Sequence, residues 1–266
     1  MNRSKQHSKK HFRCMSFGLR LVALLGLVLV LNQTESANGQ IKIMEQLGLK
    51  SGELITIDQT KKSELGITMN GQNYMVDYRF FSLRSKDFRL MVPSETGELE
   101  EVEAPPVSTI RGTLRGMEGS SVVGCITEEG CCANIRLPSG EECWMEPVSR
   151  TIDNPGVAGI HVVYTSRDVI DEGLVCGNED SNVAAALKAV ENSAAATRRQ
   201  GPLTIADLAV EADFDFFQGF GSVSATLREV ENLINIANQQ FARQASIRLP
   251  VSGCNVRGSG RDSARI

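Results

Sequence analysis

The sequence predicts an α+β protein, in which a mainly antiparallel β region of the sandwich or barrel type precedes the opening strand, helix and strand of an α/β domain. Two observations predict this order. Between residues 40 and 164, short stretches rich in β-branched and aromatic residues alternate with turns of Gly, Pro and Ser. Between residues 207 and 251, a pattern of period two precedes a pattern with three- and four-residue steps, and a second period-two pattern follows.

The β-rich region contains a series of short candidate strands. The stretch 73–83 is rich in aromatic and β-branched residues, and 88–92 with 98–102 predicts a hairpin around an intervening turn. Many short strands at close spacing are typical of an antiparallel sandwich or barrel. The remaining strands are expected at 108–114, 120–126, 133–137, 141–145 and 159–164.

The second region begins with a regular alternation. Apolar and acidic residues alternate over 207–217, which predicts a half-buried strand with one wet face. A turn follows, with Ser222 or Ser224 available as helix N-cap. Apolar residues then recur at helical spacing, so 225–243 is expected to be an amphipathic helix. The stretch 245–251 alternates again and predicts a second strand.

The N-terminus has the pattern of a secretory signal. A basic stretch precedes an apolar run of eleven residues, 21–31, and small residues stand just before Gln40. This run is too short to cross a bilayer, which takes roughly 20 residues. We therefore expect export, to the medium or to the cell envelope or periplasm, with no stable membrane span after cleavage. The alternative is a membrane anchor formed by an uncleaved 17–31 segment.

The charge and composition limit the partners. Without residues 1–39, the chain keeps 227 residues with 22 basic and 31 acidic side chains, a formal charge of −9. No basic patch remains to hold a phosphate backbone, so nucleic acid is excluded as an expected partner. Composition divides the chain into a signal, a β-rich region, a linker with a dibasic pair, a strand–helix–strand region and an out-of-pattern tail: 1–39, 40–177, 178–202, 203–251 and 252–266.

Cysteine usage agrees with export. Six cysteines remain after the signal, and an oxidising compartment favours their pairing, although six cysteines allow 15 connectivities. A zinc knuckle is the alternative, but the spacing lacks C-x₂-C pairs and no histidine lies near. The expected disulfide candidates are the four cysteines that stand within nineteen residues: Cys125, Cys131, Cys132 and Cys143.

Two further site patterns are weak. Gly219 and Gly221 open a helix as in a dinucleotide-binding loop, but the strand before them alternates polar and apolar residues where a central parallel strand is apolar on both faces. Cys176 with His161 has the residue types of a nucleophile and its base, yet no oxyanion turn accompanies them. A disulfide cysteine and a strand histidine are the favoured interpretation of that pair. The chain has no GxSxG, no Walker A loop and no histidine pair at helical spacing.

Read in order, four segments resemble the precursor of a reprolysin-type (adamalysin, M12B) zinc metalloendopeptidase of the metzincin clan. The stretches "STIRGTLRGMEGSSVVGCI" (108–126), "CWMEPV" (143–148) and "HVVYTSRDVIDEGLVCG" (161–177) are similar to segments of the family's pro-domain. Residues 207–251 resemble the first strand, first long helix and second strand of its catalytic domain. The resemblance covers most of 70–251 and implies peptide hydrolysis with a zinc cofactor and a protein or peptide substrate.

The resemblance also implies a latency mechanism. The cysteine of the family's Cys-Gly is a switch, and it corresponds to Cys176. A catalytic zinc keeps one position open for water, and a thiolate is a strong ligand that occupies it. Cleavage after Arg198 and Arg199 would remove the pro-region. The alternative for Cys176 is a disulfide with Cys254 or with a cysteine of 125–143.

The family's zinc-binding helix, H-E-x-x-H-x-x-G-x-x-H, is not found in this sequence. Residues 252–266 depart from the family pattern, as expected for a truncated or frameshifted reading frame, so no catalytic residue or metal ligand is assigned here. We expect this chain to hold no catalytic zinc and to be inactive as given. The alternatives are a non-enzymatic exported β-sandwich module for binding or adhesion, and an inhibitor that acts in trans through Cys176.

Overall fold

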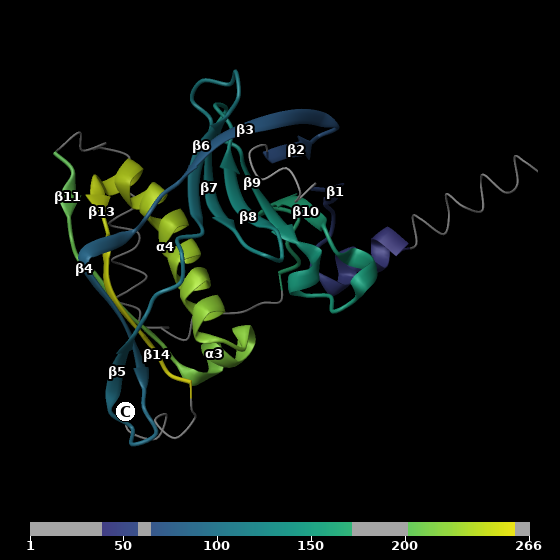
Figure 1. Cartoon of the computed structure of the whole chain (residues 1–266). Coiled ribbons are helices and arrows are strands. Elements are labelled where there is room, and N and C mark those ends of the chain that lie inside the picture. Colours follow the sequence, from purple (N-terminus) through teal and green to yellow (C-terminus); the bar gives the residue numbers. More distant parts are fainter. Residues whose placement is uncertain (1–38, 58–64, 172–201, 259–266) are drawn as a thin grey trace, which may run out of the picture. The chain divides into compact units, whose positions relative to one another are not determined.

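The computed structural model of the chain describes three ranges of residues: 39–57, 65–171 and 202–258 (Figure 1). The chain forms two compact units, residues 1–50 and 51–266. In the first unit, residues 39–46 are helical. The strands and helices labelled in Figure 1 belong to the second unit. None of the described helices is long and apolar enough to cross a membrane.

The described residues contain an antiparallel sheet of eight strands, called here the first sheet, in the order β1-β10-β9-β8-β7-β6-β3-β2. Its two end strands contact each other, so the sheet is nearly closed and barrel-like. Aliphatic side chains such as Ile110, Val122, Ile135 and Met145 fill its inner face. The strands are β1 (Glu53–Thr56), β2 (Leu65–Met69), β3 (Gln72–Phe80), β6 (Thr109–Leu114), β7 (Ser121–Ile126), β8 (Cys131–Arg136), β9 (Glu142–Pro147) and β10 (Ile160–Thr165).

The second sheet joins segments that are far apart in the sequence. Its order is β12-β14-β4-β5, with β12 (Leu208–Ala212), β14 (Val251–Val256), β4 (Arg84–Pro93) and β5 (Leu99–Val102). The pairs β12–β14 and β14–β4 are parallel, and β4–β5 is the antiparallel hairpin expected from the sequence. A hairpin of the predicted β-rich region therefore completes the sheet of the strand–helix–strand region. A short parallel pair, β11 (Thr204–Ile205) and β13 (Ile247–Arg248), stands apart.

The predicted α+β class is confirmed. The strands expected between residues 73 and 164 are present, with ends shifted by a few residues, whereas β1 and β2 were not predicted.

The expected strand over 207–217 is wrong in its second half. The strand β12 ends at Ala212, and helix α3 (Phe214–Phe220) follows. The Asp213 side chain accepts a hydrogen bond from the backbone N–H of Phe216, which caps the start of α3. Gly221 ends the helix with a φ of 71°, a left-handed conformation that glycine adopts without strain.

The second predicted strand, 245–251, is also wrong in its position. Only Ile247–Arg248 of it pairs as β13, and the main strand β14 runs from Val251 to Val256. Pro250 stands between the two strands, and its lack of an N–H explains the interruption. Residues 251–256 are thus part of the second sheet.

Helix α4 (Val223–Ala245) contacts both sheets (Figure 1). It begins as predicted, because the Ser222 side chain accepts a hydrogen bond from the N–H of Ala225. Its apolar residues Leu227 and Val230 pack with side chains of the second sheet, in a core distinct from that of the first sheet. Other positions of α4 contact β6 and β7 of the first sheet.

Candidate functional site

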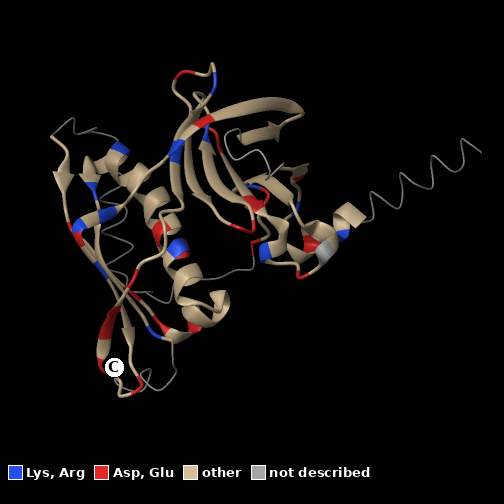
Figure 2. Cartoon of the chain, viewed as in Figure 1, with Lys and Arg blue, Asp and Glu red and all other residues tan. Residues whose placement is uncertain are grey.

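The contact between α4 and the β-rich region is polar. Charged residues of both signs occur along α4 and along β4 (Figure 2). Polar side chains are rarely buried in a helix of this kind unless they are hydrogen-bonded. Three of the buried polar residues of α4, Glu231, Asn235 and Asn238, recur at four- and three-residue steps, which places these three on one side of the helix. The buried polar residues of α4 are Thr226, Glu231, Asn232, Asn235 and Asn238.

Asn235 connects α4 to two neighbouring strands of the first sheet. Its amide nitrogen donates to the carbonyl oxygens of Ile110 on β6, at 3.0 Å, and Gly124 on β7, at 3.1 Å. Its Oδ1 accepts a hydrogen bond from Nε of Arg111 at 2.9 Å. Asn235 is fully buried, so these bonds hold the helix in one position on the sheet.

Arg111 lies in an electropositive environment. Its guanidinium stacks over the Phe81 ring, with Cζ 3.8 Å from the ring centroid. Burial, with the charges of Arg248 and Arg79, lowers the pKa of Arg111 to about 10.

Ion pairs surround this contact. Arg84 on β4 pairs with Glu231 on α4, and the Glu231 side chain is only 1% exposed. The 3₁₀ turn η1 (Val148–Arg150) places Arg150 against Glu229 of α4, with Nη2 2.8 Å from Oε2. Charged pairs at a protein interface fix its register, and desolvated ones are costly to break singly.

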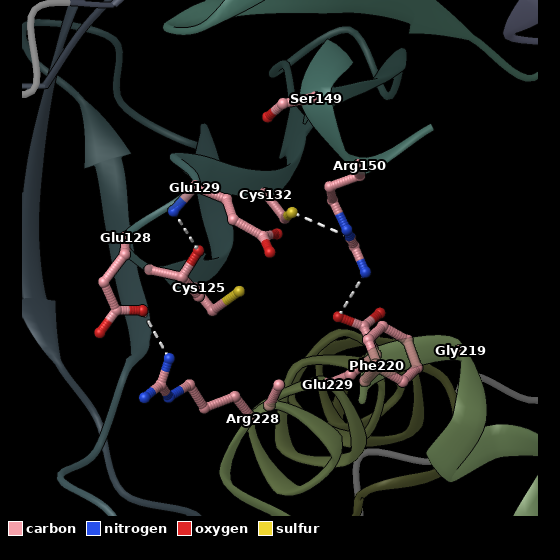
Figure 3. Close-up of a pocket in the computed structure, with 12 residues that line it drawn as sticks. Cys125, Glu128, Glu129, Cys132, Ser149, Arg150, Gly219, Phe220, Arg228 and Glu229 are labelled. Atoms are coloured by element: carbon pink, nitrogen blue, oxygen red, sulfur yellow. Dashed lines mark hydrogen bonds and ion pairs between the residues drawn. The ribbon is translucent and has the colours of Figure 1, made fainter. Parts of the chain in front are cut away.

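A cavity of about 160 Å³ lies beside the Arg150–Glu229 pair (Figure 3). It is lined by the β7–β8 turn, by η1 and by residues of α3 and α4. Both Cys125 and Cys132 line it, and Nη1 of Arg150 lies 3.0 Å from the Cys132 sulfur. At its rim, Arg228 pairs with Glu128 at 2.6 Å. A hydrogen bond with Cys132, and burial, raise the pKa of the Cys125 thiol.

His161 is a strand residue of the first sheet and is fully buried. Its Nε2 accepts a hydrogen bond from the N–H of Cys131 at 3.0 Å, and Nδ1 lies 3.1 Å from the carbonyl oxygen of Gly159, to which it donates. Burial lowers its pKa. Both nitrogens are therefore engaged within the sheet, as expected for a structural histidine and unlike a catalytic base.

The three residues to which the sequence assigned a latency or processing role, Cys176, Arg198 and Arg199, lie outside the described residues. Of the possible nucleophile–base pair Cys176 and His161, only His161 lies within the described residues.

The four disulfide candidates lie in the first sheet as buried free thiols. Cys131 and Cys143 belong to its inner core, whereas Cys125 and Cys132 line the cavity on the α4 side. Cys254, also a buried free thiol, lies in the core of the second sheet. Disulfide formation stays a prediction.

The described residues do not fit a catalytic zinc site. Within those ranges, no three His, Cys, Asp or Glu side chains gather in a way that could hold a metal ion. His161, the histidine among them, has both ring nitrogens occupied by the backbone. Zinc therefore stays an expectation for a full-length enzyme.

Sequence reasoning missed the residues that build the α4 contact. The polar stripe of Glu231, Asn235 and Asn238 is visible as a four- and three-residue spacing within an amphipathic helix. Glu231 and Asn235 build this contact, whereas Asn238 is hydrogen-bonded to the backbone of Leu249, just before β14. That signal could have identified a second buried face. Arg84 and Arg150 had no such signal, because the pairing of each depends on residues far away in the chain.

Comparison with models of protein families and with curated proteins finds no match for this chain.

Proposed function

We propose that this chain is precursor sequence of an exported zinc metalloendopeptidase, with a pro-region built on the first sheet and the opening of the catalytic domain from residue 203 onward. The observation that carries the proposal is the parallel pairing of β12 with β14 across the intervening α4. A strand, a helix and a parallel strand form the unit from which an α/β domain is built, and the sequence resemblance assigns the same segment to the start of a metzincin domain.

The polar α4 contact supports a pro-region role for the β-rich part. Contacts between regions that later separate are more polar than those of permanent assemblies. Arg84, Arg150 and Asn235 supply such a contact, through two partly buried ion pairs and three hydrogen bonds. In this proposal they position the first helix of the catalytic domain while the precursor is intact.

The pairing of β4 with β14 supports the same role. Strand β4 of the β4–β5 hairpin pairs with one edge of β14, and β12 pairs with the other edge. Both edges of β14 are therefore hydrogen-bonded to neighbouring strands. An uncovered edge strand presents unpaired backbone groups and favours aggregation. A pro-region that supplies a strand protects this edge during folding.

The proposed latency and processing residues are those that the resemblance to the reprolysin-type family implies. Cys176 is proposed as the zinc-directed thiolate, and Arg198 with Arg199 as the site at which a trypsin-like protease separates the two regions. The substrate is a protein or peptide.

Thiol labelling of Cys176 tests this role. We expect Cys176 of the purified, exported chain to react with an alkylating reagent without prior reduction, because a zinc-directed cysteine must be free. Cys143 and Cys254, which are buried in the two cores, should react only after unfolding and serve as internal controls. A Cys176 found quantitatively in a disulfide would contradict the switch.

A further inference from the structure

Cys125 and Cys132 stand directly opposite each other on the hairpin formed by β7 and β8. The turn between them is closed by Thr127 and Gly130, which exchange two backbone hydrogen bonds at 2.8 and 3.3 Å. Hydrogen-bonded positions of an antiparallel pair recur every two residues, so Cys125 and Cys132 occupy the next such position. Opposite residues there have Cα atoms about 5.5 Å apart, which is within the range that a disulfide spans.

Their side chains lie on the same side of the hairpin. Both line the cavity between the first sheet and the helices α3 and α4 (Figure 3). The neighbouring Cys131 lies in the inner core, because successive strand residues point to opposite faces. Cys143 shares that inner face but is paired with Ile135, four residues along β8 from Cys131. Among the described cysteines, therefore, Cys125 and Cys132 are the pair that the register places side by side.

The two sulfurs lie next to each other beside a cavity. Each thiol is almost fully buried, and the Cys125 thiol is hydrogen-bonded to Cys132. The cavity of about 160 Å³ gives a path to both. Nη1 of Arg150 lies 3.0 Å from the Cys132 sulfur, on the cavity side of the hairpin.

We propose that Cys125 and Cys132 are a thiol–disulfide exchange site that forms a cross-strand disulfide. The oxidant is a disulfide, either of a small molecule or of a disulfide-bonded oxidoreductase. The Cys132 sulfur attacks it to give a mixed disulfide and one released thiol. The Cys125 sulfur then displaces the second thiol. One S–S bond forms and one breaks, and the two thiol protons pass to the released thiols. The site does not depend on the peptidase proposal.

Oxidation at this site should also stabilise the hairpin. The bond closes a loop of about eight residues, and the chain-entropy model together with the size of this protein gives a rise in Tm of about 5 °C. The bond lies next to Arg150, which keeps its ion pair with Glu229.

Peptide mapping of the whole chain tests the inference. The folded protein is incubated with oxidised glutathione, its free thiols are alkylated in denaturant, and a protease specific for glutamate then cuts at Glu128 and Glu129. Those two residues form the turn, so the cut separates Cys125 from Cys131 and Cys132. We expect the two peptides to remain linked until a reductant is added. Alkylated Cys125 in the oxidised sample would overturn the proposal.

Three variants identify the partner. The link should be lost in Cys132→Ala and retained in Cys131→Ala and in Cys143→Ala, which removes a buried cysteine elsewhere on the same sheet. A link retained in Cys132→Ala would assign the bond to another cysteine and overturn the pairing. The mapping of the unmodified chain does not depend on the folding of any variant.

Discussion

Arg84 and Glu231 form a two-point ion pair that connects the β4–β5 hairpin to helix α4. Nε of Arg84 lies 2.6 Å from Oε1 of Glu231, and Nη2 lies 3.1 Å from Oε2. The two side chains are 15% and 1% exposed. The residues are 147 positions apart, so the pair joins the proposed pro-region to the proposed catalytic region. Bidentate geometry of this kind is specific to arginine.

Removal of one partner should be strongly destabilising. In Arg84→Ala, the Glu231 carboxylate stays buried without its cation, and we expect a loss of about 3–5 kcal/mol in the free energy of unfolding. Urea denaturation measures it. Arg115→Ala, which removes an ion pair with Asp77 whose side chains are 56% and 52% exposed, is the control and should leave the midpoint nearly unchanged. Equal effects of the two variants would contradict the role assigned to Arg84.

Asn235→Ala should loosen α4 from the first sheet. The substitution leaves the carbonyl oxygens of Ile110 and Gly124 and the Nε of Arg111 without this partner, and a loss of about 2–4 kcal/mol is expected. Gln240→Ala, at an exposed position of the same helix, is the control. Hydrogen exchange of α4 amides should be faster in Asn235→Ala alone. Unchanged exchange would show that the helix is held by other contacts.

The buried His161 predicts a pH dependence of stability. Its pKa in the folded protein is lowered from 6.5, chiefly by burial. Below pH 6.5 the unfolded chain takes up a proton that the folded chain does not, so stability falls as the pH falls from there towards the lowered pKa. Above pH 6.5, His161 is neutral in both states and does not change the free energy of unfolding with pH.

His161→Gln is the matched variant for this pH effect. Gln can still accept from the Cys131 N–H through Oε1, but it does not ionise. Unfolding curves between pH 7.5 and 5 should show a smaller loss of stability in His161→Gln than in the unmodified chain. Parallel losses in the two proteins would show that His161 is not the titrating group.

Gly130 is required by its contact with His161. It has a φ of 139°, and a Cβ added there would overlap with the imidazole Nε2. Gly130→Ala should therefore displace the ring and destabilise the hairpin by more than Gly140→Ala. Gly140 also has a positive φ, of 90°, but an added Cβ would meet only Arg136 Nη2 at 3.7 Å. The Tm of Gly130→Ala should therefore be lower than that of Gly140→Ala, because only Gly130 lies against the His161 ring. Equal Tm values for the two variants would argue against this contact.

The predictable part of the fold is the part with local periodicity. The strands β6 to β10 could be predicted because short stretches of strand-forming residues are separated by turn residues. Helix α4 could be predicted because apolar residues recur at helical spacing directly after Ser222, which caps the helix. The start of α3 was mistaken for a strand, since Phe214 and Phe216 alternate with acidic residues. Asp213 caps the start of this helix and Gly221 caps its end.

The rest could not be predicted, because it depends on pairing over long distances in the sequence. Nothing local to β4 indicates that it lies beside β14. The polar stripe of α4 was readable, but its partners, such as the carbonyl of Gly124 and the side chain of Arg150, were not. The facing of Cys125 and Cys132 required the register of the hairpin, in which β8 begins at Cys131, two residues earlier than expected.

The central claim is that residues from 203 onward open a zinc peptidase domain. The nucleotide sequence that follows the codon for Val256, the last residue of β14, tests it most directly when translated in all three frames. The account predicts that one frame encodes a helix with the pattern H-E-x-x-H-x-x-G-x-x-H. The absence of this pattern from every frame would contradict the claim and favour a binding module or an inhibitor.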